Sequence, residues 1–235
     1  MLSDPDSAII RRFALFNENT SPDSRDYGIP HPGVLLVDAA GIVRERFFNE
    51  RYYHRTTMPA ALSRLGMPPH VESVAMDHEH LQIRSGASDA TVFPGSQFTL
   101  FVDVIPLPGV HIYGQEIPGG YQGLEVTIEQ LPYLTVLASR YPEASPLTLA
   151  WTDEELTGYT NPLRVTIDVA LGTRQELAAV LEAGGGVTIT GTVKLQACDD
   201  RICWAPDSIP TEWHVDLRPP DLERSPEPLQ HKPKG

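Results

Sequence analysis

A strict two-residue alternation in the stretch 187–197 constrains the fold of this chain more than any other feature. Apolar or small side chains occupy the odd positions from Val187 to Ala197, and Thr, Lys or Gln occupies each even position. This is the pattern of a half-buried β-strand, whose successive side chains point to opposite faces. The strand leads directly into Cys198 and Cys203, the only two cysteines of the chain. Continuing the alternation places Cys198 on the polar face, so we expect its sulfur to point outward.

The short spacing of Cys198 and Cys203 fits two interpretations. A structural disulfide would staple a hairpin, whereas a redox-active pair would cycle between disulfide and dithiol. In the chain-entropy description a crosslink over so short a loop contributes only about 2 kcal/mol or less. Such a staple does little for a chain of 235 residues, so we favour the redox interpretation. A metal site ranks third, because two thiolates without a neighbouring Cys or His pair do not complete a tetrahedral set.

Several further segments repeat the two-residue alternation and predict an antiparallel β-sandwich. Apolar side chains alternate with mostly polar ones in 97–104, 124–129, 163–169 and 213–217. Turns rich in Gly and Pro separate these segments, and many short strands with such turns are typical of a sandwich. One helix interrupts the strands. Thr173 and Glu176 form a capping box ahead of it, and the glycines of 184–186 end it.

The first 66 residues predict a small α/β segment rather than further alternating strands. A helix should begin in 3–6, where a capping residue, a proline and acidic side chains meet. Apolar side chains then recur with helical spacing, at Ile9, Ile10, Phe13 and Phe16. Strands at 34–37 and 42–48 are expected to form a hairpin around a turn at 38–41. Thr57 should cap a second helix, with Pro59 near its start and Gly66 at its end.

These patterns divide the chain into four parts. Residues 1–66 form the α/β segment, and the proline pair in 67–69 predicts a stiff linker. Residues 70–218 hold the alternating strands and should form the sandwich. Residues 219–235 are rich in proline and charge, so we expect a disordered tail. The predicted fold class is therefore mainly β, with a small α/β segment in front.

The charge and hydropathy of the chain exclude several classes of partner. A formal net charge of −13 argues against nucleic acid and against an anionic membrane surface, since both bind basic side chains. No apolar run reaches the ~18 residues of a membrane span, so we expect no direct membrane insertion. The first residues are acidic where an export signal has a basic region. If the cysteines act outside the cytoplasm, the export signal is expected in sequence not present here.

The cysteine segment 194–206 resembles that of the N-terminal periplasmic domain of the thiol:disulfide interchange protein DsbD. The resemblance rests on Gln196-Ala197-Cys198, on the acidic insert before Cys203 and on Pro206 soon after it. Two upstream stretches, 93–96 and 109–113, also look like parts of the family pattern, and the resemblance covers roughly residues 70–217. It implies an immunoglobulin-like sandwich in the periplasm.

The resemblance also implies a function. Such a domain relays electrons by thiol–disulfide exchange, from a membrane-embedded dithiol to thioredoxin-like partners, without a cofactor. By analogy Cys203 is the attacking sulfur and Cys198 the resolving one. Asp199 and Asp200 should raise the pKa of nearby thiols, and Arg201 should oppose them.

A cap loop over the cysteines is a second implication of the resemblance. The acidic run at Glu154 and Glu155, followed by Leu156, is similar to the family segment that shields the sulfurs until a partner arrives. Leu156 stands where the family often has phenylalanine. An exposed acidic turn is the alternative. His111 and Tyr113, in the stretch 109–113, are expected in the surround of the site.

The order of elements in residues 1–66 resembles the C-terminal half of a thioredoxin-fold redoxin of the peroxiredoxin-like kind. Pro32 matches the place where that fold usually holds a cis-proline. No cysteine precedes Cys198, so this segment should have no peroxidase or reductase activity alone. A small α/β segment that merely packs against its neighbour is the alternative.

Two further hypotheses concern a pair of histidines and the function of the whole chain. His78 and His80 would share one face of a strand and offer two metal ligands, but a solvated strand face is favoured because no third ligand is evident. For the whole chain, the rival to electron relay is a non-enzymatic sandwich that binds a partner protein and holds a structural disulfide. A reducible, solvent-reachable cysteine pair would distinguish the two functions.

Overall fold

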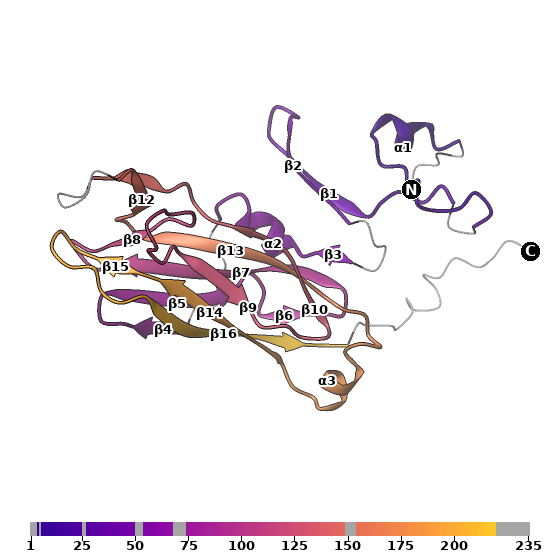
Figure 1. Cartoon of the computed structure of the whole chain (residues 1–235). Helices are drawn as coiled ribbons and strands as arrows, with labels where there is room; N and C mark the ends of the chain where they lie inside the picture. Colours follow the sequence, from indigo (N-terminus) through magenta and orange to yellow (C-terminus); the bar gives the residue numbers. More distant parts are fainter. Residues whose placement is uncertain are drawn as a thin grey trace, which may run out of the picture.

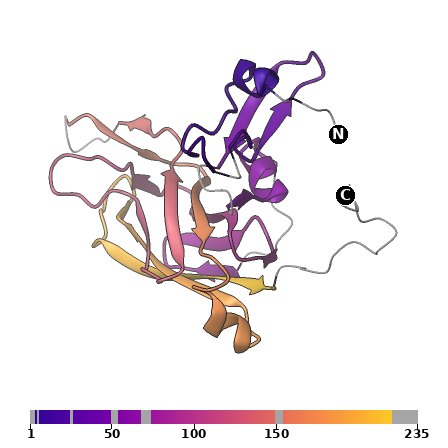
Figure 2. The same cartoon turned by 90° about the vertical axis from the view of Figure 1, so that its right-hand side faces the viewer.

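The computed structural model describes residues 4, 6–24, 27–49, 54–67, 74–148 and 154–219. Figure 1 and Figure 2 show long strands stacked together, with the first helix and the first hairpin of the chain lying above them in both views. Among the described residues strands far outnumber helices, and neighbouring strands of the main sheets are mostly antiparallel. The predicted mainly β, antiparallel fold class is confirmed.

The largest sheet forms one layer of the sandwich. Its order is β10-β13-β7-β5-β4, and each neighbouring pair is antiparallel. The strands are β4 (Val74–Asp77), β5 (Leu81–Ala87), β7 (Ser96–Pro106), β10 (Leu134–Arg140) and β13 (Leu163–Leu171). Two of them, β7 and β13, contain the alternating segments 97–104 and 163–169.

The second layer contains the strand that leads to the cysteines. Its order is β6-β16-β14-β9. The strands are β6 (Thr91–Val92), β9 (Glu125–Ile128), β14 (Val187–Leu195) and β16 (Asp207–Leu217). In β14 the odd positions are buried and the even ones are not, as the alternation predicts.

The core lies between these two layers, and Trp213 is its largest member. Trp213 of β16 is 1% exposed, and its Nε1 donates a hydrogen bond to the carbonyl oxygen of Phe101 in β7 at 3.0 Å. A Cβ on Gly191 would come within 2.3 Å of the Thr127 carbonyl oxygen and within 3.0 Å of the Trp213 ring. The glycine in an otherwise apolar alternation therefore allows both the neighbouring strand and the tryptophan to approach closely.

The predicted N-terminal hairpin forms, as a two-stranded sheet of its own. Strand β1 (Gly33–Val37) pairs antiparallel with β2 (Val43–Phe48). The turn between them is closed by Asp38, whose carboxylate accepts hydrogen bonds from the backbone N–H groups of Ala40 and Ile42. Such side-chain to backbone bonds explain why aspartate begins tight turns.

The first helix is shorter than predicted and does not bury its apolar side chains. Helix α1 spans Ala8–Arg12, and the carboxylate of Asp4 accepts from the backbone N–H groups of Ile9 and Ile10. Ile9 and Phe13 are both more than half exposed. The peptide bond before Pro32, at the place where the thioredoxin fold usually holds a cis-proline, is trans. The resemblance to half a thioredoxin fold stays a prediction.

The two elements after the hairpin pack onto the sandwich. Strand β3 (Arg55–Thr56) adds to β7 in parallel, and helix α2 (Met58–Ser63) follows. Thr57 caps α2 as predicted, accepting from the backbone N–H of Ala60 at 3.2 Å. Ala60 is 3% exposed and belongs to the main core. These contacts link residues 55–63 physically to the sandwich, although the predicted division at 67–69 stays a prediction.

The helix predicted between the last strands is also present. Helix α3 spans Ala178–Glu182, and Thr173 and Glu176 exchange the hydrogen bonds of a capping box just before it. Gly184 follows with a positive φ of 67°, the left-handed conformation that ends helices. Residues 68–69 of the predicted linker and 220–235 of the predicted tail lie outside the described residues. No helix of the described part is long and apolar enough to cross a membrane.

Candidate redox site

A small third sheet carries Cys198 and lies at the end of the sandwich away from α3 (Figure 1), and Cys203 joins Cys198 through an isolated β-bridge. Its order is β11-β12-β8-β15. The strands are β8 (His111–Tyr113), β11 (Ser145–Leu147), β12 (Leu156–Tyr159) and β15 (Ala197–Cys198). Glycine makes this sheet compact, because a Cβ on Gly158 of β12 would come within 2.3 Å of the Ile112 carbonyl oxygen.

Cys198 and Cys203 face each other across a tight hairpin and form a disulfide. The backbone N–H of Asp199 donates to the carbonyl of Ile202, and that of Trp204 donates to the carbonyl of Ala197. The cysteines between these two bonds are therefore a non-hydrogen-bonded pair, the arrangement that brings opposite side chains closest. Their Cα atoms are 4.1 Å apart.

The expectation that Cys198 points outward is wrong. Its exposed fraction is 0%, whereas Cys203 is only partly buried. The alternation ends because β14 stops at Leu195 and the chain crosses into the third sheet, where Ala197 and Cys198 are both buried. A strict two-residue parity holds only within one strand of one sheet.

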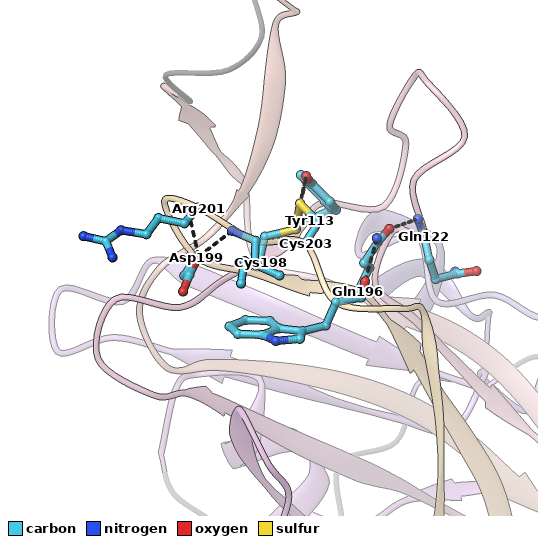
Figure 3. The surroundings of a disulfide bond; sticks show 9 residues. Tyr113, Gln122, Gln196, Cys198, Asp199, Arg201 and Cys203 are labelled. Atoms are coloured by element: carbon cyan, nitrogen blue, oxygen red, sulfur yellow. Dashed lines mark hydrogen bonds between the residues drawn. A yellow bond between two sulfur atoms is a disulfide. The ribbon is translucent and has the colours of Figure 1, made fainter.

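Gln196 holds the crossing point between the two sheets. Its side chain is buried, its Oε1 accepts from the backbone N–H of Gln122 at 3.0 Å, and its Nε2 donates to the carbonyl of Trp204 at 2.9 Å (Figure 3). Sequence reasoning placed Gln196 on a solvated face and missed this role. The sequence signal for this role is a glutamine next to a cysteine at the end of a strand. If such an amide is buried, its polar atoms must be held by hydrogen bonds.

Asp199 rigidifies the loop between the cysteines. Its Oδ1 accepts hydrogen bonds from the backbone N–H groups of Arg201 and Ile202, each at 2.7 Å (Figure 3). These two bonds hold the pKa of Asp199 below its ordinary value. The carboxylate of Asp199 therefore binds the backbone of its own loop. The sequence predicts only its effect on the pKa of the thiols and not this structural role.

Tyr113 contacts both sulfur atoms. Its hydroxyl oxygen lies 3.3 Å from Sγ of Cys203 and 3.3 Å from Sγ of Cys198 (Figure 3). Burial, together with the smaller effects of the nearby Tyr121 and Glu154, raises the pKa of Tyr113 to about 12. The phenol therefore keeps its proton at neutral pH and is a hydrogen-bond donor to sulfur.

An apolar cluster separate from the main core surrounds the disulfide. Tyr113, Leu156 and Cys198 are its buried members. Partly buried side chains pack around them, namely Ile117, Tyr121, Leu147 and Cys203. Among the residues expected to form a cap loop, Leu156 therefore lies in the same cluster as the sulfurs, with 2% of its surface exposed. Glu154 and Glu155 are exposed, and residue 153 lies outside the described part.

His111 lies directly opposite Cys198 in the register of β8 and β15. It is 4% exposed, and its ring meets that of Tyr113 edge-on at a centroid distance of 5.7 Å. Within the described part of the chain its buried Nε2 has no hydrogen-bond partner. Burial lowers the pKa of His111, while the charges of Asp200 and Asp199 oppose that effect.

The histidines of the β4–β5 turn lie beside the segment that follows Cys203. Nε2 of His78 is 3.0 Å from a carboxylate oxygen of Asp207, and the ring of His80 stacks on Trp204 with centroids 3.6 Å apart. A cavity of about 400 Å³ lies between them. The described residues contain no group of three side chains that could hold a metal ion, so these contacts provide no support for the metal alternative.

The fold and the cysteine pair together define a β-sandwich protein with a disulfide built into a hairpin at one end. The family model for the N-terminal region of the thiol:disulfide interchange protein DsbD matches residues 81–212, more than half of the chain. The chain therefore belongs to this family, and the sandwich is of the immunoglobulin-like kind expected for it.

Comparison with solved structures finds the N-terminal periplasmic domain of ScsB from Proteus mirabilis, at 17% sequence identity and a TM-score of 0.38. The match covers 61% of this chain and 49% of that structure, so the chain spans about half of it. No curated protein sequence matches the chain.

Proposed function

We propose that this chain relays electrons by thiol–disulfide exchange through Cys198 and Cys203. Family membership supports the reaction class, and the unequal exposure of the two sulfurs is the observation that carries the proposal. Cys203 is partly exposed, whereas Cys198 is fully buried. An incoming sulfur reaches Cys203 first, so a mixed disulfide forms on Cys203 and Cys198 stays inside to resolve it.

The proposed transfer oxidises this chain and reduces its partner. The Cys203 thiolate attacks one sulfur of the partner's disulfide, which opens and leaves a thiolate on the partner's other sulfur. The Cys198 thiolate then attacks Sγ of Cys203, and the intermolecular bond breaks with its electron pair on the partner. The products are the Cys198–Cys203 disulfide and a partner dithiol. No cofactor takes part in these steps.

The surroundings of the sulfurs support this chemistry. The Tyr113 hydroxyl, 3.3 Å from each sulfur, can stabilise a developing thiolate by donating its proton in a hydrogen bond. The loop of 199–202, tied by Asp199, keeps the two cysteines opposed after reduction. The closing step is therefore intramolecular and preorganised.

The same proposal includes the partners of the chain, its compartment and a cap over the sulfurs, each suggested by the family. A membrane-embedded dithiol would reduce the disulfide, thioredoxin-like proteins would receive the electrons, and the exchange would take place in the periplasm. The segment from Glu154 to Leu156 would shield the sulfurs until a partner displaces it. The burial of Leu156 against Cys198 and Tyr113 supports that shielding role.

One observation favours the rival function, a partner-binding sandwich with a structural disulfide. Complete burial of Cys198 and a tightly bonded loop are also features of a structural crosslink. The rival requires that the pair stays oxidised in contact with physiological thiols. The two functions therefore differ in whether physiological thiols can reduce the disulfide, which can be measured.

Exchange with a thioredoxin-like protein tests the proposed function directly. Full-length chain is reduced, freed of reductant and mixed with an oxidised thioredoxin-like protein, and the thiols of each are counted after acid quenching. We expect the chain to lose both thiols while the partner gains two, within minutes at neutral pH. Chain left in the disulfide form is the control. Retention of both thiols by the reduced chain would support the structural rival.

A further inference from the structure

The release step of the proposed function leaves one proton unaccounted for. Cys198 must become a thiolate before it attacks Sγ of Cys203, because the thiol is not the nucleophile. Its exposed fraction is 0%, and it lies in an apolar cluster with Leu156. Such surroundings disfavour a thiolate relative to a thiol. A group inside the site must therefore take the proton.

The neighbouring acidic and phenolic groups are unsuited to this task. Tyr113 contacts the sulfur but keeps its own proton, because burial raises its pKa to about 12. Asp199 is engaged by two backbone N–H groups, and Asp200 is exposed. On β12, the residue opposite Tyr113 is Gly158, which has no side chain to offer. Glu154, ahead of that strand, is exposed.

His111 has the placement and the free nitrogen that the step requires. It pairs directly with Cys198 in the β8–β15 register, and opposite side chains of an antiparallel pair share a face with Cβ atoms about 4.5–5.5 Å apart. Tyr113, two residues along β8 and on that same face, reaches Sγ of Cys198. The Nε2 atom of His111 is buried and has no hydrogen-bond partner in the described part of the chain.

An unpaired polar nitrogen inside a protein is costly, and such atoms often have a role in another state of the molecule. The disulfide state holds no proton on either sulfur. The dithiol state adds a donor, the Cys198 S–H group, to the face on which His111 lies. A neutral imidazole beside a thiol is the pairing that activates cysteine nucleophiles in general.

We propose that His111 accepts the proton of Cys198 and thereby speeds the release of the partner. The inference rests on the proposed function. In the forward step the thiol proton moves to Nε2, and the Cys198 thiolate attacks Sγ of Cys203. The Cys203–partner bond breaks, and the partner leaves as a thiolate that takes a proton from the imidazolium or from water. In the reverse direction the imidazolium protonates Cys198 as it leaves.

The expected pH dependence follows from the charges around His111. Burial lowers its pKa below the ordinary 6.5, while Asp200 and Asp199 act in the opposite direction. Arg201, on the same loop as the two aspartates, acts electrostatically on Asp199. The imidazole is therefore neutral and able to accept a proton at pH 7. Release should slow as the pH falls through the pKa of His111, because the protonated ring cannot serve as a base.

Ellman's reagent isolates the step, since its two thiolates leave one after the other. Reduced full-length chain gives a first, concentration-dependent phase when Cys203 attacks, and a second, concentration-independent phase when Cys198 closes the disulfide. His111→Gln and His111→Phe are compared with wild type from pH 5 to 10. His214→Phe is the control, since His214 lies exposed on β16.

At pH 7 we expect the second phase of both His111 variants to slow by about a hundredfold, the typical contribution of a positioned base. The first phase should change by less than about twofold, because Cys203 attacks from the accessible side. Above about pH 9 the deficit should shrink, since hydroxide then ionises the buried thiol without help. The His214→Phe control should keep the wild-type profile.

Two results would overturn the inference, and a third would overturn the function beneath it. An unchanged second phase in both His111 variants means that Cys198 loses its proton elsewhere. A deficit that is equal at every pH means that His111 only shapes the site. A wild-type chain that releases one equivalent and never closes its disulfide contradicts the proposed function itself.

Discussion

Cys203→Ser is expected to abolish electron transfer, whereas Cys198→Ser is expected to trap the partner covalently. The difference follows from the exposure of the two sulfurs. Partly exposed Cys203 reaches the partner, and buried Cys198 can only attack Cys203. Without Cys203 we expect transfer to fall by at least roughly a thousandfold, as when other nucleophiles are removed. Without Cys198 the mixed disulfide has no intramolecular exit and accumulates.

Non-reducing gels distinguish these outcomes. Each reduced variant is incubated with an oxidised thioredoxin-like protein and quenched in acid before electrophoresis. We expect a complex with Cys198→Ser that reductant dissolves, and none with Cys203→Ser. The double variant is the matched control for non-specific crosslinks. A complex that forms only with Cys203→Ser would reverse the two roles, and the absence of a complex with both would contradict the exchange mechanism.

Removal of the segment that holds β3 and α2 should cost the sandwich about 3 kcal/mol of unfolding free energy, the scale of losing buried methyl groups and a buried hydrogen bond together. Ala60 of α2 would leave the core. Asp89, whose pKa is raised by burial, would lose the hydrogen bond from the Thr57 hydroxyl. Asp168, buried in β13, would keep its salt bridge with Arg140 and lose the one with Arg64.

Urea unfolding of two fragments measures this effect. A fragment of residues 54–219 keeps β3 and α2, and a fragment of residues 70–219 lacks them. We expect the longer fragment to match the whole chain within about 1 kcal/mol, and the shorter one to unfold at clearly lower urea. Equal midpoints for the two fragments would show that the boundary lies at 67–69 after all. A longer fragment much weaker than the whole chain would place the β1–β2 hairpin within the same cooperative unit.

Strands β7, β9, β13, β14 and β16 were predictable from sequence because each one carries its own periodic signal. The alternation from Val187 onward is present in β14 as predicted, and the hairpin around Asp38 formed because a turn residue and two apolar runs are local features. The position of Cys198 was not predictable in this way. Its burial depends on the chain crossing from one sheet to another at Gln196, a tertiary event that leaves the local pattern unchanged.

The candidate site shows the same division between local and long-range information. Cys198 and Cys203 are five positions apart in the sequence and were identified from it. The stretch 109–113 was found by resemblance. The contact of the Tyr113 hydroxyl with both sulfurs depends on strands 85 residues apart. The register that sets His111 opposite Cys198 depends on the same pairing. The attachment of α2 to the sandwich is likewise a long-range contact, which is why the proline pair alone suggested a later boundary.

The central claim is that the Cys198–Cys203 pair exchanges with thiols, and its reduction potential tests that claim most directly. The whole chain is equilibrated with glutathione buffers of known ratio, quenched in acid and scored for free thiols. The account predicts a midpoint within the working range of such buffers, between about −180 and −260 mV. A midpoint below about −300 mV, in the range of resistant structural disulfides, would contradict it.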